Sequence, residues 1–177
     1  VGDWVILDES LTKIEKILER KSLFKRLSAG ESNELQPIAA NIDTLFIVTS
    51  CNEEFKESRL ERYLALCTEA GAMPVIVLTK ADLVEDADSY VRRARKTKVG
   101  VPVEAINALD PASINGLSSW VDNTSTVALV GSSGVGKSTI LNTFAGRSLA
   151  STGQIRDDDK KGRHTTTHRE LHILPSG

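Results

Sequence analysis

Short runs of apolar, β-branched residues recur along the chain from about residue 38, and polar stretches separate them. Runs of this kind are typical of strands that are buried on both faces of a sheet. The expected strands are Leu45–Cys51, Pro74–Thr79, Val101–Ile106 and Thr126–Val130. Because expected helices alternate with these strands, we predict βαβ units and a mostly parallel sheet.

The segments between these runs predict helices. The first ends at Gly71, a residue that suits the C-terminal cap of a helix. The expected helices are Glu57–Ala70, Asp88–Thr97, Ser113–Val121 and Lys137–Ala145. After the last of them, Arg147–His168 is polar and predicts a mobile loop, and Glu170–Leu174 predicts a final strand.

The first 35 residues have a different pattern. Val1–Leu7 alternates loosely, as a strand does. Leu11–Leu27 mixes apolar residues with many charged ones, and its periodicity fits either short β-strands or a helix. Ser28–Asn33 has the composition of a linker.

The composition is that of an ordinary globular protein, and it narrows the choice of partners. Hydrophobic residues make up 40% of the 177 residues, and the net charge is −2. A chain with this balance does not bind polyanions as a whole, so any contact with nucleic acid must come from a local basic patch. The candidate patches are Lys13–Arg26, Arg92–Lys96 and the loop residues Arg156, Lys160, Lys161, Arg163 and Arg169. For each patch, a solvated charged surface is the alternative.

The cysteines and the apolar runs indicate the cellular setting. Cys51 and Cys67 lie in stretches that we expect to be buried and form no CxxC pair, which favours free thiols in a reduced cytoplasmic protein. No apolar run approaches the roughly 18 residues of a membrane span, so we expect no membrane segment. The chain begins at Val1 without Met and ends at Gly177 just after an expected strand, so we expect it to be a piece of a longer protein.

The segment Gly131–Ser138 reads GSSGVGKS and matches the phosphate-loop pattern GxxxxGK[ST]. An expected strand precedes it and an expected helix follows it, which is the context that the pattern requires. The glycines let the loop curl so that its backbone N–H groups and the helix N-terminus hold phosphate oxygens. We expect Lys137 to reach the β and γ phosphates and Ser138 to bind Mg²⁺ through its hydroxyl.

Two further segments predict which base is bound. Thr79–Asp82 reads TKAD and resembles the [NT]KxD element of GTPases. Asp82 would accept hydrogen bonds from guanine N1–H and the 2-amino group, and adenine lacks this pair of donors. The aliphatic stem of Lys80 would lie along the base. After the next strand, the amide of Ala108 in the pair Asn107–Ala108 would donate to guanine O6.

Both segments follow predicted parallel strands, where ligands bind in open α/β sheets, and guanine is therefore favoured over adenine. The residues predicted to bind the nucleotide are Thr79, Lys80, Ala81, Asp82, Asn107, Ala108, Gly131, Ser132, Ser133, Gly134, Val135, Gly136, Lys137, Ser138 and Thr139.

The order of these motifs is unusual, because the base-reading segments precede the phosphate loop. A circularly permuted chain can form the same sheet, since the ends of a compact domain are often close together. This order resembles the RsgA (also YjeQ or EngC) family of ribosome-associated GTPases, and so do three strings: VGDWV at Val1–Val5, QPIAANID at Gln36–Asp43 and GRHTTTHREL at Gly162–Leu171.

The resemblance implies an α/β fold: a P-loop GTPase domain with circularly permuted motif order, preceded by part of an OB-fold β-barrel. Residues 1–35 would be the last part of that barrel, and residues 36–177 an incomplete G domain without its DxxG element. The family also has a C-terminal zinc-binding domain, so Zn²⁺ is expected only in that absent domain. The implied activity is Mg²⁺-dependent hydrolysis of GTP to GDP by a cytoplasmic monomer that acts on 16S rRNA in late maturation of the small ribosomal subunit.

The resemblance also places a Mg²⁺-binding threonine in the loop after the phosphate site. Of Thr165, Thr166 and Thr167 we favour Thr167, with Thr166 as the alternative. His164 would help to position the attacking water. The predicted catalytic residues are therefore Lys137, Thr167 and His164, and the predicted Mg²⁺ ligands are Ser138 and Thr167.

Histidines 164, 168 and 172 have the spacing of a helical metal site, but the β-branched run beside them argues against a helix.

The function has alternatives as well. In place of a hydrolase, the chain could be a switch whose nucleotide state sets its affinity for RNA. A P-loop ATPase or kinase is the third reading, and the TKAD segment argues against it.

Overall fold

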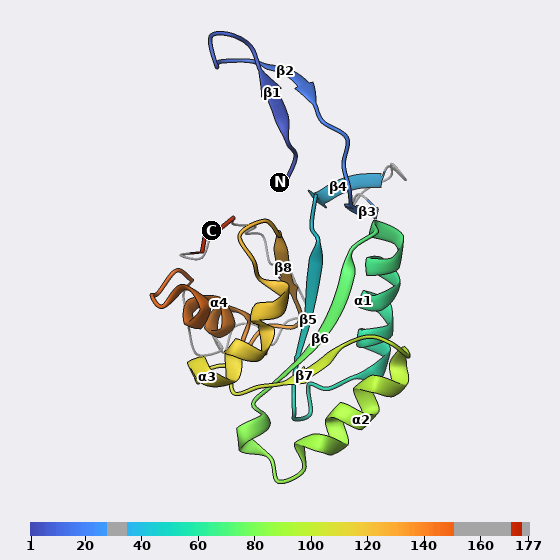
Figure 1. Cartoon of the computed structure of the whole chain (residues 1–177). Helices are drawn as coiled ribbons and strands as arrows, with labels where there is room; N and C mark the ends of the chain where they lie inside the picture. The colour runs from blue at the N-terminus through green and yellow to red at the C-terminus, as the bar shows by residue number, and fades with distance from the viewer. Residues whose placement is uncertain (28–34, 151–170, 175–177) are drawn as a thin grey trace, which may run out of the picture.

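The computed structural model describes residues 1–27, 35–150 and 171–174. Its centre is a parallel sheet of four strands in the order β7-β6-β5-β8 (Figure 1). These strands are β5 (Thr44–Ser50), β6 (Met73–Thr79), β7 (Val103–Ala105) and β8 (Val127–Val130). All four expected strands and their parallel arrangement are therefore confirmed, although β7 is shorter than the apolar run suggested.

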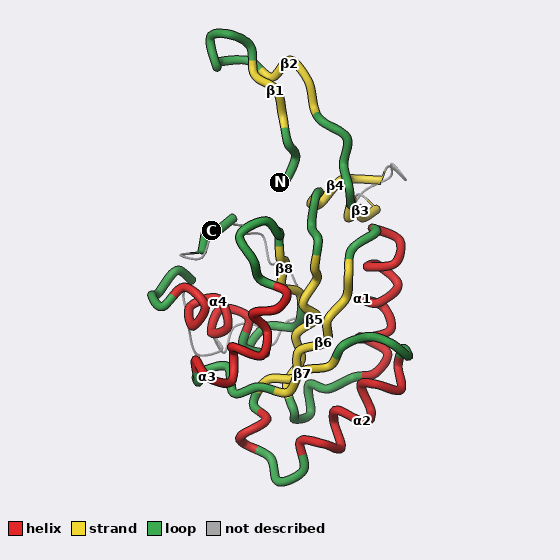
Figure 2. The backbone as a smooth tube through the Cα atoms, in the orientation of Figure 1, coloured by secondary structure: helices red, strands yellow, loops and turns green. Residues whose placement is uncertain are grey.

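Helices cover both faces of this sheet, as Figure 2 shows. On one face lie α1 (Glu57–Ala70) and α2 (Ala87–Thr97). On the other lie α3 (Pro111–Ile114), α4 (Lys137–Ala145) and the 3₁₀ helix η2 (Asn115–Trp120); a further 3₁₀ turn, η1 (Ala81–Leu83), follows β6. The helix expected at Ser113–Val121 begins earlier, because Asp110 accepts a hydrogen bond from the Ala112 amide and caps α3. It is divided between α3 and η2.

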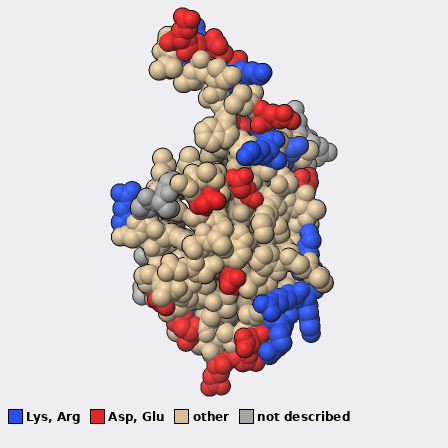
Figure 3. All heavy atoms as spheres, in the orientation of Figure 1, with Lys and Arg blue, Asp and Glu red and all other residues tan. Residues whose placement is uncertain are grey.

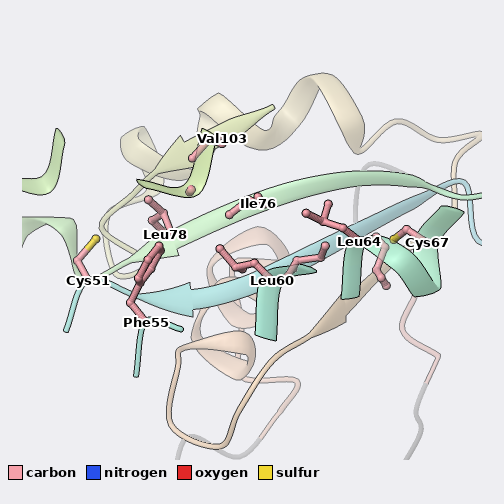
Figure 4. Packing of buried hydrophobic residues seen from close by; sticks show 11 residues of the cluster. Cys51, Phe55, Leu60, Leu64, Cys67, Ile76, Leu78 and Val103 are labelled. Carbon is pink, nitrogen blue, oxygen red and sulfur yellow. The ribbon is translucent and has the colours of Figure 1, made fainter. Parts of the chain in front are cut away.

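The apolar runs are continuous because each strand contributes to two cores. In β5, all seven residues are buried. Leu45 and Ile47 pack with α1 and α2, and Phe46 and Val48 pack with the helices of the opposite face. Figure 4 shows the first of these cores, where side chains of α1 meet those of β6. Each fully buried side chain of this size contributes about 1.5–3 kcal/mol, so the packing on both faces fixes β5 as the centre of the sheet.

The N-terminal residues form small antiparallel sheets. β1 (Val5–Leu7) pairs with β2 (Ile14–Ile17) in an arm that projects from the body (Figure 1), and β3 (Leu23–Leu27) pairs with β4 (Leu35–Ala40). Of the two readings open for Leu11–Leu27, the structure shows strands. Antiparallel strands of this kind are consistent with part of a β-barrel.

The strand predicted at Glu170–Leu174 is wrong for the four described residues, 171–174, which have no regular secondary structure. Alternating apolar and polar residues favour a strand, but the backbone adopts one only where a neighbouring strand can satisfy its N–H and C=O groups. In the described ranges, none of the helices is long and apolar enough to cross a membrane.

Candidate nucleotide-binding site

The phosphate loop leaves the C-terminal end of β8 and runs into α4. Three of its glycines have positive φ: Gly131 at 152°, Gly134 at 74° and Gly136 at 102°. At Gly131 there is also no room for a side chain, because a Cβ atom would lie 2.2 Å from the carbonyl oxygen of Val48 in β5. The loop can therefore curl as tightly as it does only with glycine at this position.

The phosphate loop is anchored at Val135, and the two residues before it are exposed. Val135 is completely buried in the core between the sheet and α4, whereas Ser133 and Gly134 are exposed. The buried side chain holds the loop against the domain, while the neighbouring backbone amides remain at the surface, where a ligand can reach them.

The N-terminus of α4 supplies further donors. Gly136 precedes the helix, and no side chain caps the first turn. The amides of that turn are thus available for an anion, and the helix dipole favours one there. Ser138 and Thr139 lie in this turn and are partly buried. These features fit a phosphate group, as the sequence pattern predicted.

Lys137 lies across the loop. Its Nζ donates to the carbonyl oxygens of Gly131 at 2.9 Å and Ser132 at 2.6 Å. Burial lowers the pKa of Lys137, because the charged ammonium loses water. A bound phosphate would supply the negative charge that this partly desolvated cation lacks.

Thr79 connects the TKAD segment to the phosphate loop. Its side chain is completely buried at the end of β6, and its hydroxyl donates to the Val135 carbonyl at 2.6 Å. A Cβ on Gly136 would lie 3.4 Å from the Thr79 methyl group, so the two segments are in close contact. Thr79 therefore positions the phosphate loop, a role that the four-letter motif does not reveal.

The rest of the TKAD segment turns toward the surface. Lys80 has a left-handed backbone, with φ 58°, and Ala81 and Asp82 continue into η1. The Asp82 side chain is exposed, and within the described ranges no protein group donates to its carboxylate. This geometry leaves both oxygens for a ligand with two donors.

The pair Asn107–Ala108 lies beside the TKAD segment. The Ala81 amide donates to the Ile106 carbonyl at 3.3 Å, which ties the two loops together. The Asn107 side chain accepts from the Leu109 amide at 3.0 Å and shapes the turn, while the Ala108 carbonyl accepts from Thr143 of α4 at 2.8 Å. A shallow, open hollow of about 350 Å³ adjoins this turn, between Leu109 and the α4 residue Thr139.

One residue at this edge of the sheet was not predicted from the sequence. Arg59, in the first turn of α1, donates through Nη1 to the hydroxyl of Ser132 in the phosphate loop. The same nitrogen lies 3.2 Å from the carboxylate of Glu54. The only sequence feature that could have indicated Arg59 is its position shortly after β5. The loop after β5 leaves the same end of the sheet as the phosphate loop, where ligands bind in such folds.

The predicted residues of the following loop, His164, Thr165, Thr166 and Thr167, lie outside the described residues, as do the basic residues Arg156, Lys160, Lys161, Arg163 and Arg169. In the described part of the chain, no group of three or more His, Cys, Asp or Glu side chains could hold a metal ion. Both cysteines are free and buried, and burial raises the pKa of each thiol to about 11.

A family model described as RsgA GTPase matches residues 17–177. The chain belongs to the RsgA GTPase family. It is 52% identical to a Vibrio parahaemolyticus protein named small ribosomal subunit biogenesis GTPase RsgA 2, over 100% of this chain and 49% of that protein. It is 49% identical to the Mesorhizobium japonicum small ribosomal subunit biogenesis GTPase RsgA, over 100% of this chain and 52% of that protein. The chain thus spans about half the length of these curated relatives.

Solved structures agree with the family in fold. The crystal structure of YjeQ from Thermotoga maritima superposes with a TM-score of 0.63 at 26% identity, over 81% of this chain and 50% of that one. The structure of YloQ, described as a circularly permuted GTPase, superposes with a TM-score of 0.60 at 25% identity, over 82% of this chain and 49% of that one. A circularly permuted fold, as described for YloQ, agrees with the order of motifs in this chain, where the TKAD and Asn107–Ala108 segments precede the phosphate loop.

Proposed function

We propose that this chain is the nucleotide-binding part of an Mg²⁺-dependent GTPase that acts in the biogenesis of the small ribosomal subunit. One observation carries the proposal: the buried hydrogen bond from Thr79 to the Val135 carbonyl, which joins residues 56 positions apart. It fixes the segment that would read the base against the loop that would hold the phosphates. A single nucleotide can therefore occupy both.

Each part of the site has a distinct role in this proposal. Lys137 and the amides of the phosphate loop hold the β and γ phosphates, and Ser138 contributes its hydroxyl to Mg²⁺. Asp82 accepts from the N1–H and the 2-amino group of guanine, and the Ala108 amide donates to O6. Bound Mg²⁺ would neutralise charge that develops on the phosphates.

The residues that would complete hydrolysis lie in the loop after α4. Thr167 as a second Mg²⁺ ligand and His164 as a group that positions water are both parts of the proposal. Zn²⁺ is proposed only for a C-terminal zinc-binding domain of the kind that the family has.

The partner in this proposal is the small ribosomal subunit, through 16S rRNA. The names of the relatives support it, since both are called small ribosomal subunit biogenesis GTPases. We propose that the chain acts as a monomer and that the subunit stimulates hydrolysis. GTP turnover measured with and without purified small subunits checks this, and equal rates would contradict it.

Base competition tests the nucleotide itself. A fluorescent GDP analogue is displaced from the wild type and from Asp82→Asn by unlabelled GDP, ADP and xanthosine diphosphate. We expect GDP to compete far better than ADP in the wild type, because a carboxylate left unpaired by the wrong base costs about 1–3 kcal/mol or more. Asp82→Asn should lose this preference and gain xanthine, whose 2-carbonyl accepts from an amide.

Asp88→Asn is the matched control, because Asp88 is an exposed carboxylate near the start of α2, outside the TKAD segment. It should bind as the wild type does. Equal competition by ADP in the wild type would mean that TKAD is only a turn and that the base is not read by Asp82.

A further inference from the structure

The phosphate loop touches a second cation besides its own lysine. Arg59 reaches from α1 to the Ser132 hydroxyl, while Lys137 donates to the Ser132 carbonyl at 2.6 Å. Two positive side chains from segments far apart in the sequence therefore meet at one residue of the loop. A cluster of this kind suits a ligand with several negative charges.

The position of Ser132 shows which part of a nucleotide would lie nearby. In phosphate loops the lysine reaches the β and γ phosphates. Since the ammonium of Lys137 lies against Ser132, this residue marks the side of the loop where the terminal phosphates bind. Arg59 approaches from that side.

Arg59 also has donors to spare. Its contacts in the described part of the chain, to Ser132, to the Glu54 carboxylate and to the Glu54 carbonyl, all use Nη1. A guanidinium carries five N–H donors in a rigid plane, so those on Nε and Nη2 can serve a phosphate oxygen. The Arg59 side chain is 28% exposed, which leaves it open to a ligand.

Glu54 holds the arginine in this place. Its amide donates to the Asn52 side chain at 2.9 Å, which orders the loop after β5, and its carboxylate lies 3.2 Å from Arg59. The carboxylate is half exposed, so it is a weak competitor that a phosphate with two negative charges can replace.

We propose that Arg59 is a phosphate-binding residue of this site, which contacts the terminal phosphate of GTP and so favours GTP over GDP, with Glu54 as its partner before GTP binds. The inference rests on the proposed nucleotide site. Arginine at a terminal phosphate also stabilises the charge of the transition state, which is spread over the equatorial oxygens.

The test compares the affinities for GDP and for a non-hydrolysable GTP analogue. Arg59→Gln should weaken binding of the GTP analogue by about tenfold or more beyond its effect on GDP, as expected for a lost charged hydrogen bond. Glu54→Gln removes the competitor and should shift the preference the other way. Arg92→Gln is the control, because Arg92 forms its exposed ion pair with Asp86, away from the loop, and the preference should not change.

The ratio of the two affinities separates binding from support of the fold. An equal loss for GDP and the GTP analogue in Arg59→Gln would show that Arg59 only shapes the loop and would overturn the proposal, and so would unchanged affinities. If the wild type binds neither nucleotide, the proposed function itself fails. If Arg59→Gln does not fold, an unchanged preference in Glu54→Gln overturns the proposal.

Discussion

At the scale of single residues, Thr79 shows how the two halves of the site depend on each other. Its hydroxyl is completely buried and donates to the backbone of the phosphate loop. A side chain in that position cannot be replaced by an apolar one without leaving the Val135 carbonyl without its donor. Its contribution therefore affects both the fold and the ligand.

We predict that Thr79→Val, which keeps the shape and removes the hydroxyl, lowers the free energy of unfolding by about 1–3 kcal/mol. Because the phosphate loop loses its tie to β6, nucleotide affinity should fall as well. Urea unfolding and GDP titration measure the two effects. Thr68→Val, at an exposed threonine whose hydroxyl bonds only within its own helix and to Lys98, should change both much less.

Sequence reasoning at this scale located the residues that belong to local motifs. Lys137 and Asp82 lie where the patterns placed them, at the C-terminal edge of the sheet. Arg59 could not be found in this way, because its contact with Ser132 joins residues 73 positions apart and no short pattern contains both. The buried role of Thr79 was missed for the same reason.

At the scale of elements, the curvature of the phosphate loop depends on how closely β8 lies to β5. Gly131 follows β8 directly and faces the backbone of Val48. The neighbouring strand, and not only the backbone angle, therefore demands glycine.

Strand positions were predictable from apolar runs, whereas the short extent of β7 and the early start of α3 depend on pairing and capping that the runs do not encode.

We predict that Gly131→Ala abolishes nucleotide binding and destabilises the domain by more than about 2 kcal/mol, since a main-chain oxygen cannot move aside without disturbing the sheet. Gly100→Ala is the control, because Gly100 also has positive φ, at 85°, but no atom lies within 4 Å of its Cβ position. It should cost only about 1–2 kcal/mol and leave binding intact. Similar losses in both variants would show that the clash with Val48 is unimportant.

At the scale of the whole molecule, the charged side chains lie at the surface and nearly balance, with a net charge of −2. Figure 3 shows basic side chains gathered over α2 beside acidic ones at the same end of the domain. The interior is nearly uncharged, and its titratable groups include the two thiols, which are buried on the face that α1 covers. The response of the fold to alkaline pH should therefore come in part from these thiols.

The pKa of each thiol is raised to about 11 from an ordinary value of 9.0, because burial disfavours the thiolate. The unfolded chain loses these protons first, so the contribution of the protonated thiols to stability is fully present below pH 9 and falls as the pH rises toward 11. We predict that the free energy of unfolding falls by up to about 2–3 kcal/mol per thiol across this window. Urea unfolding at several pH values measures this change. Lys137 acts in the opposite direction, since its pKa is lowered. A Cys51→Ala, Cys67→Ala protein with the same decline would contradict this origin.

The pairing of β8 with β5 also has a consequence for the order of folding. The start of this pairing includes a hydrogen bond from the Thr126 amide to Asp43, which joins residues 83 positions apart, whereas β5, α1 and β6 form a compact unit of nearby residues. Closing the longer loop is slower, and chains emerge from the ribosome N-terminus first. We therefore expect the turn after β6 to form early and the phosphate loop to be added last. A nascent chain would bind nucleotide only after β8 pairs with β5, so nucleotide binding would indicate that this sheet has formed.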